Sequence, residues 1–186
     1  MGEVFKEISK KDRDFISKQQ IFFVGTAPKS GNINVSPKGM DSFRVLDSNH
    51  IIWLNMTGSG NETAAHLLED TRMTIMFCSF EKKPQILRLY GHAREHQHDS
   101  ENWSQLLGHF PDSTQKKPGI RQIFDMKVDM VQTSCGYQVP MYDYKEEREL
   151  LDTWAENKGT KGVREYWKGK NQTSLNGKPT GLRTEV

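Results

Sequence analysis

Hydrophobic and polar residues alternate in short runs along most of the chain, and this alternation predicts many strands and few long helices. We expect strands over residues 20–27, 33–39, 42–46, 50–56, 72–80, 85–96 and 123–131. The run 72–80 is apolar on both faces, which is typical of a strand in the middle of a sheet. In the last strand, four residues are expected on one face: Phe124, Met126, Val128 and Met130.

Helical periodicity is confined to short segments. We expect helices over residues 10–18, 62–70, 100–110, 146–157 and 161–168, followed by a turn-rich tail. Many of the strands are joined by turns of a few residues, which favours antiparallel pairing because parallel strands need crossovers of a dozen residues or more. The sequence predicts a mainly β (α+β) fold, a small antiparallel, Greek-key-like barrel with peripheral helices. We expect one domain over residues 1–186, with about 141–186 packed on the barrel.

Composition and charge exclude several classes of protein. The 186 residues carry a net charge of +2, and no block of like charge suggests a nucleic-acid partner. No uninterrupted apolar run exceeds four residues, as in Ile51 to Leu54, so no membrane-spanning segment is expected. The hydrophobic fraction of 34% is low for this length, and a bound cofactor or a subunit interface could supply the missing burial. Two distant cysteines and a charged N-terminus indicate a cytoplasmic protein.

The glycine-rich segment 57–61 lies between an expected strand and an expected helix. The N-terminus of a helix attracts anions such as phosphate, and Ser59, Asn61 and Thr63 would add polar groups there. The same residues also fit helix capping, since Ser59 and Glu62 have the spacing of a capping box and Asn61 could cap alone. Spacing alone favours capping and leaves phosphate binding open. The lysine of a P-loop is missing.

A second polar pair lies on the strand 33–39. Ser36 and Lys38 are two residues apart, so both side chains point to the same face. A hydroxyl beside an ammonium suits a phosphate or a flavin carbonyl, but the pair taken alone favours a solvated edge strand protected by a lysine. Pro37 cannot donate a ladder hydrogen bond, which places this strand at an edge.

The remaining candidates for chemistry are weaker. His92, His96 and His98 lie close in sequence, but no further ligand has a zinc-site spacing, so we expect no metal. Cys78 is expected to be a buried apolar residue. Cys135 lies in a loop with no histidine near it in sequence, which argues against a nucleophilic role.

Six segments are informative when they are taken together: FVGTA, NVSPKG, WLNMTGSGNETAAHLLED, RMTIMFCSFE, LRLYGHA and CGYQVPMYDYKEERELLDTW. In this order and spacing they resemble the pyridoxamine 5′-phosphate oxidase-related, FMN-binding proteins, over roughly residues 20–182. The tail NQTSLNGKPTGL resembles the end of one bacterial subgroup of that family. The resemblance implies a split β-barrel and a homodimer with FMN held at the subunit interface.

The resemblance also implies roles for individual residues. Ser36 would lie near the flavin ring and Lys38 on the phosphate, while the loop after residue 56 would close on the phosphate. The expected flavin contacts are Asn34, Val35, Ser36, Lys38, Leu54, Asn55, Thr57, Ser59, Gly60, Asn61, Glu62, Thr63, Arg88 and Cys135. The last two would reach the flavin from the partner chain.

Two departures from the family pattern limit the functional prediction. True pyridoxamine 5′-phosphate oxidases carry Arg-Lys at about the positions of Glu62 and Thr63, and they end in a strand that grips pyridoxal phosphate. The resemblance therefore implies an FMN-dependent oxidoreductase with an unassigned small-molecule substrate or electron donor. It does not imply the reaction of the true pyridoxamine 5′-phosphate oxidases. The alternative is a flavin- or haem-binding carrier or sensor without turnover.

Overall fold

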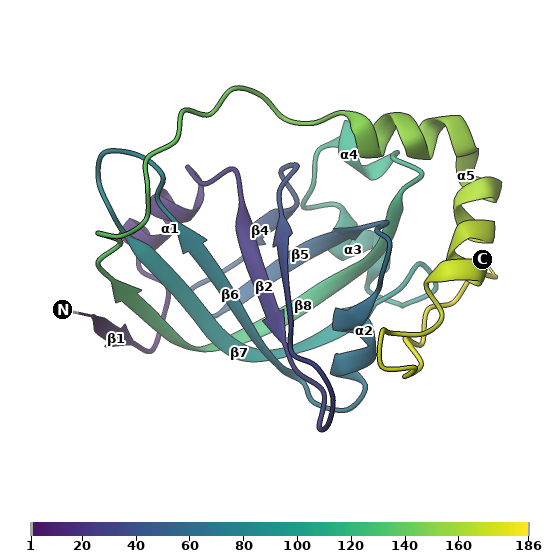
Figure 1. The fold of residues 1–186 in the computed structure, drawn as a ribbon, viewed down its shortest axis with the longest axis horizontal. Helices are drawn as coiled ribbons and strands as arrows, with labels where there is room; N and C mark the ends of the chain where they lie inside the picture. Colours follow the sequence, from purple (N-terminus) through teal and green to yellow (C-terminus); the bar gives the residue numbers. More distant parts are fainter. Residues whose placement is uncertain (1, 186) are drawn as a thin grey trace.

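The computed structural model describes residues 2–185, and strands dominate it (Figure 1). The strands are β1 (Glu3–Phe5), β2 (Phe22–Thr26), β3 (Asn34–Lys38), β4 (Phe43–Val45), β5 (His50–Met56), β6 (Arg72–Cys78), β7 (Ile86–His96) and β8 (Ile120–Ser134). The helices are α1 (Lys10–Ile16), α2 (Glu62–Leu67), α3 (Trp103–Leu107), α4 (Asp112–Gln115) and α5 (Leu150–Lys170). The predicted strands are confirmed, whereas β1 and α4 were not predicted.

These strands form one antiparallel sheet in the order β3-β2-β6-β7-β8-β5-β4, with β1 paired to β8. The strand that contains Pro37 lies at an edge and β6 lies inside the sheet, as the sequence predicts. The sheet curls strongly. Phe22 on β2 and Phe43 on β4, at the opposite edge of the sheet, come together with ring centroids only 5.1 Å apart. The fold is therefore a curled, antiparallel half-barrel with peripheral helices, which confirms the predicted fold class.

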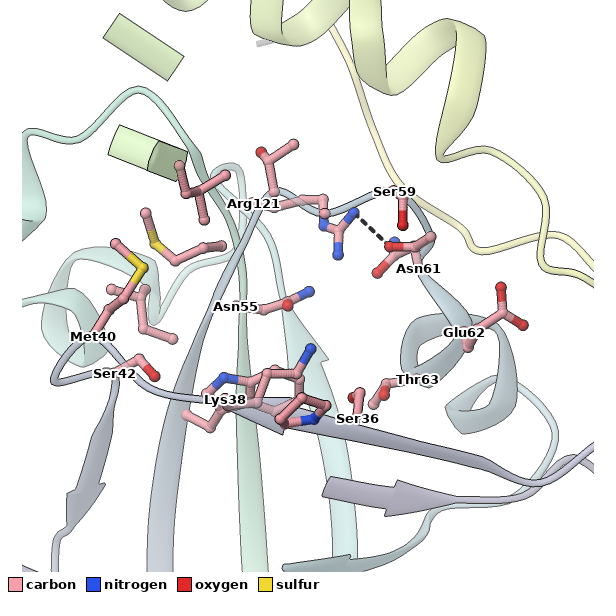
Figure 2. A pocket seen from close by; sticks show the side chains of 18 of the residues that line it. Ser36, Lys38, Met40, Ser42, Asn55, Ser59, Asn61, Glu62, Thr63 and Arg121 are labelled. Carbon is pink, nitrogen blue, oxygen red and sulfur yellow. Dashed lines mark hydrogen bonds between the residues drawn. The ribbon is translucent and has the colours of Figure 1, made fainter. Parts of the chain in front are cut away.

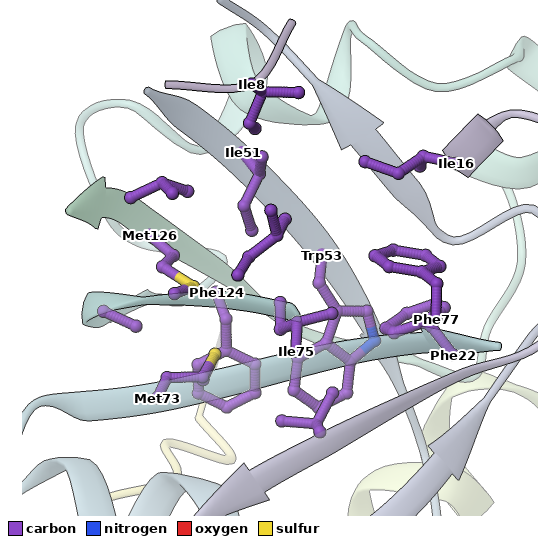
Figure 3. Close-up of a cluster of buried hydrophobic side chains, with 14 of the residues drawn as sticks. Ile8, Ile16, Phe22, Ile51, Trp53, Met73, Ile75, Phe77, Phe124 and Met126 are labelled. Atoms are coloured by element: carbon purple, nitrogen blue, oxygen red, sulfur yellow. The ribbon is translucent and has the colours of Figure 1, made fainter. Parts of the chain in front are cut away.

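The main core fills the inside of this curl (Figure 3). Trp53 and Phe124 stack at 4.8 Å across β5 and β8, and Phe77 packs against Phe22. A second cluster on the other side of β5 and β8 includes Ile52, Leu54 and residues of α3. Together, the two clusters hold β5 on both faces, so the end of this strand is a rigid platform.

A β-bulge interrupts the pairing of β7 with β8. Tyr90 pairs with Met130 but Gly91 pairs with Val128, so one residue of β8 is left over. A Cβ atom on Gly91 would lie 1.9 Å from the carbonyl oxygen of Lys127, so only glycine fits there. The bulge changes the inward face: Val131 is fully buried and Met130 is 37% exposed. Our prediction that Met130 shares the buried face was wrong, because the alternation of residues in the sequence does not reveal where a bulge adds an extra residue to the strand.

The C-terminal segment packs against the end of the half-barrel near α2 (Figure 1). Two helices were predicted over 146–157 and 161–168, and α5 does consist of two helical segments that meet at a kink at Gly159, whose φ is +63°, although the first begins only at Leu150. Residues 135–149 are not helical and form a loop that leads from β8 to α5. Within residues 2–185, no helix is long and apolar enough to span a bilayer.

Candidate functional site

A cavity of about 370 Å³ lies where the ends of β3 and β5 meet the start of α2 (Figure 2). β3 supplies Ser36 and Lys38, and β5 supplies Asn55 at the end of its rigid platform. The loop 57–61 forms another wall, while β8 and α5 contribute Arg121 and Leu151. Residues that are far apart in sequence thus converge on one small, polar site.

Most of the residues predicted for flavin contact line this cavity. They are Asn34, Ser36, Lys38, Leu54, Asn55, Thr57, Ser59, Gly60, Asn61, Glu62 and Thr63. The other three lie elsewhere in the single chain. Val35 is 65% exposed on the opposite face of β3, Arg88 donates to the Ser134 hydroxyl at 3.2 Å, and Cys135 is exposed beyond the end of β8.

Lys38 is held inside the cavity mouth. Its ammonium lies 5.1 Å from the centre of the ring of Trp53, a residue of the barrel core, which is within cation–π distance. Burial, together with the nearby positive charge of Arg121, lowers the pKa of Lys38 to about 8. The alternative of a solvated, protective edge lysine does not describe this residue.

Arg121 is the residue that sequence reasoning missed. Its side chain is almost fully buried, and it donates to the carbonyl of Gly60 at 3.1 Å (Figure 2) and to the side chain of Asn171 at 2.7 Å. Its Nε has no hydrogen-bond partner among the described residues. Burial lowers its pKa to about 10, which leaves it charged at neutral pH. The signal for it in the sequence is a single charged residue between Ile120 and Ile123, the apolar residues near the start of β8.

The predicted capping box does not form. Asn61 is the N-cap residue of α2, but its side chain makes no capping hydrogen bond. Both polar atoms of the Asn61 amide are buried without a partner in the described chain. The Glu62 carboxylate accepts the backbone N–H of Leu175 and so anchors the tail instead of the helix. An unpartnered buried amide costs about 1–3 kcal/mol, so the Asn61 amide can gain hydrogen bonds from a group outside the chain.

The C-terminal segment braces the loop that closes the cavity. Asn171, fully buried, donates to the carbonyl of Gly58 at 3.1 Å while it accepts from Arg121. Trp167 donates to the Thr57 hydroxyl at 2.8 Å, and that hydroxyl donates to the carbonyl of Gly119. The hydroxyls of Thr57 and Ser42 are therefore hydrogen-bonded within the chain, and the other hydroxyls that line the cavity belong to Ser36, Ser59 and Thr63.

The site can bind an anionic small molecule. The buried Arg121, the half-buried Lys38, one unpartnered amide and several hydroxyls surround a cavity within the usual range of about 300–1,000 Å³ for ligand pockets. Charge-assisted hydrogen bonds from lysine and arginine are the strong contacts that phosphate groups use. The α2 helix has only six residues, so these side chains, more than the helix, would neutralise the charge of an anion at this site.

The three neighbouring histidines point to separate partners. His92 lies near Asp129, His96 near Asp125, and His98 contacts the carbonyl of Ile120. Among residues 2–185, no group of three or more potential ligands could hold a metal ion.

Comparison with known proteins gives consistent matches. The family model described as pyridoxamine 5′-phosphate oxidase matches residues 8–135. The pyridoxamine 5′-phosphate oxidase family protein ustO of Aspergillus flavus is 36% identical over 142 residues, which cover 75% of this chain. The chain spans only 56% of the length of that relative.

Two solved structures illustrate the likeness of the fold. A variant of HupZ from Group A Streptococcus has a TM-score of 0.56 at 18% identity, over 68% of this chain and 99% of that chain. HutZ, a haem storage protein of Vibrio cholerae, has a TM-score of 0.50 at 15% identity, over 70% of this chain and 98% of that chain. At these identities the likeness concerns the fold alone.

Proposed function

The chain belongs to the pyridoxamine 5′-phosphate oxidase family, and from this membership and the cavity we propose that it binds FMN and acts as an FMN-dependent oxidoreductase. The observation that carries the proposal is the cluster of Lys38, Arg121 and the unpartnered Asn61 amide around one cavity. A phosphate supplies what these groups lack: negative charge for the two cations and acceptor oxygens for the amide. The residues present therefore fit the phosphate end of FMN.

Different walls of the cavity bind different parts of FMN. Lys38 and Arg121 hold the phosphate, and Ser36 and Asn55 contact the rest of the ligand along β3 and β5. FMN, when bound, supplies the redox chemistry, and the protein supplies orientation and electrostatics. The chain keeps Glu62 where the founding oxidases carry a basic residue, and that glutamate holds the tail. We therefore propose a different small-molecule substrate or electron donor for this protein.

The cavity favours flavin over haem as the ligand. Haem iron is held by an axial His, Cys or Tyr, or by a Met that acts together with a His. The described residues that line the cavity include Met40 and Met56 but no His, Cys or Tyr, so the cavity offers no methionine–histidine pair and no other side chain of these types. A protein that carries flavin without turnover remains the competing function, and the experiment below separates the two.

We also propose a homodimer. Apolar side chains are exposed on the outer face of the sheet, with Ile33 74%, Val35 65% and Met130 37% exposed. A second copy that covers this face would bury them and would explain how Val35, Arg88 or Cys135 could approach a flavin bound by the partner. Both cysteines are free, which agrees with a reducing compartment such as the cytoplasm.

The proposal is tested by adding FMN to purified protein at about 100 μM, a concentration that fills a site of micromolar affinity. We expect bound flavin with quenched fluorescence, steady oxidation of NADH or NADPH, and a dimeric mass by light scattering. Failure of FMN and FAD to bind would refute the cofactor. Tight binding with no turnover by NADH, NADPH or reduced deazaflavin would establish the carrier instead.

FMN affinity should fall as the pH rises above about 8. The free site holds the pKa of Lys38 at about 8, and a bound phosphate would favour the charged lysine. Above this pH, binding must first protonate the lysine, so FMN affinity should decrease by up to tenfold per pH unit. Fluorescence titrations between pH 7 and 9.5 measure the slope, with riboflavin as the phosphate-free reference. Parallel FMN and riboflavin curves would contradict the role of Lys38.

A further inference from the structure

Two buried amides and a carboxylate form a hydrogen-bonded series that starts at the cavity. Asn55 lines the cavity at the end of β5, and its Nδ2 donates to Oε1 of Gln122 on β8 at 3.2 Å. The Nε2 of Gln122 donates to Oε2 of Glu95 on β7 at 2.5 Å. Asn55 is 2% exposed and Gln122 is fully buried, so water cannot replace either bond easily.

The far end of the series is fixed by backbone groups. Gln97 donates from Nε2 to Oε1 of Glu95 at 2.7 Å and to the carbonyl of Gly181 at 2.9 Å. Its Oε1 accepts the backbone N–H of Arg183 at 2.7 Å. A backbone N–H can only donate and a backbone carbonyl can only accept, so the orientation of Gln97 is determined. Glu95 therefore accepts hydrogen bonds through both of its oxygens.

This arrangement determines which atom the cavity receives. Burial raises the pKa of Glu95, and the hydrogen bonds from Gln97 and Gln122 and the positive charges of Arg183 and Arg121 limit that rise. In its ionised form the carboxylate has no proton to donate, so Gln122 must turn its NH₂ toward Glu95 and its oxygen toward Asn55. Asn55 must then turn its NH₂ toward Gln122. Its Oδ1 forms no hydrogen bond among the described residues, and it is left as an acceptor at the cavity.

We propose that Glu95 is a positioning residue that, through Gln122, makes Asn55 a hydrogen-bond acceptor for a ligand O–H or N–H group. This proposal rests on the proposed flavin site. In the cavity, Lys38 and Arg121 would bind an anionic group of the ligand, and Asn55 would accept a hydrogen bond from an O–H or N–H group of the same ligand. The ligand class is accordingly a phosphate ester that also carries a hydroxyl or a ring N–H, and FMN offers both kinds of donor.

The test uses the variants Glu95→Gln, Asn55→Asp and the double variant that carries both changes. Glu95→Gln allows the whole series to reverse, so riboflavin affinity should fall about tenfold. Asn55→Asp alone places carboxylates at both ends of Gln122, which can donate to only one of them. In the double variant the carboxylate has moved from one end to the other, so Gln122 reverses and the new carboxylate at position 55 still offers an acceptor. Riboflavin serves as the ligand because it carries no phosphate for that carboxylate to repel.

We expect the double variant to melt at a higher temperature than Asn55→Asp and to regain most of the riboflavin affinity that Glu95→Gln loses. Glu101→Gln makes the same chemical change at an exposed position and should change neither property. Wild-type affinity in Glu95→Gln, or a double variant that binds no better than Glu95→Gln, would overturn the proposal. If the wild-type protein binds no flavin, the proposed function fails, while the melting order of the four proteins still decides whether Glu95 orients Asn55. N3-methylated riboflavin shows whether the donor is the ring N–H or a ribityl hydroxyl.

Discussion

Replacing Lys38 with methionine should lower FMN affinity by about 10- to 150-fold and leave riboflavin affinity nearly unchanged. The change removes a charge-assisted hydrogen bond to phosphate, which contributes about 1.5–3 kcal/mol, and each 1.4 kcal/mol is tenfold in affinity. Methionine is an unbranched side chain that can fill most of the space of the lysine beside the Trp53 ring, so the wall of the cavity should be preserved. Titration of flavin fluorescence with both ligands measures the two affinities. Equal losses for FMN and riboflavin would show that Lys38 meets the ring or only supports the fold.

The same variant should stabilise the ligand-free protein at pH 7. The pKa of Lys38 is about 8 in the folded chain against 10.5 for a free side chain, so the unfolded chain binds more protons between these values. Wild-type stability therefore carries a penalty at pH 7 that disappears as the pH rises from 8 to 10.5. The advantage of Lys38→Met in urea unfolding should shrink over that interval. A variant that is less stable than wild type at pH 7 would show that the charge supports the fold.

Gly91→Ala should cost about 3 kcal/mol or more of folding free energy. The new Cβ would lie 1.9 Å from the carbonyl oxygen of Lys127, and a backbone atom cannot move aside as a flexible side chain can. Relief requires β7 and β8 to separate at the bulge, next to the buried Val128 and Val131. Because small proteins are stable by only about 5–15 kcal/mol, the midpoint of urea unfolding should fall sharply.

Gly169→Ala is the matched control, because nothing lies within 4 Å of a Cβ at that position near the end of α5. Alanine is the better helix former by about 0.5–1 kcal/mol, so this variant should unfold at the same or a higher urea concentration. Similar midpoints for the two variants would mean that the close approach at Gly91 is not required by the fold.

The local pattern alone predicted the strands β2 to β8 and the place of β3 at an edge. Side chains alternate with a period of two in any strand, so the shared face of Ser36 and Lys38 followed from their spacing. Pro37 placed β3 at an edge because proline lacks the backbone donor that an inner strand needs. The family resemblance brought the loop 57–61 and the end of β5 into the same expectation, and the structure places both at one cavity. Their contacts with flavin remain a prediction.

Contacts between distant segments were beyond the sequence pattern. Arg121 joins Lys38 at the cavity because β8 crosses the sheet beside β5, and nothing in the spacing of the two residues records that crossing. The bulge at Gly91 reversed the face of Met130 through the approach of a second strand. Asn61 had the sequence of a helix cap, yet its amide remained without a partner in the described chain. The sequence by itself thus determined the strands, the edge and the polar residues, since these depend on neighbours along the chain. Only the tertiary structure decided which charges share the cavity and which polar atoms remain unpaired, since these depend on neighbours in space.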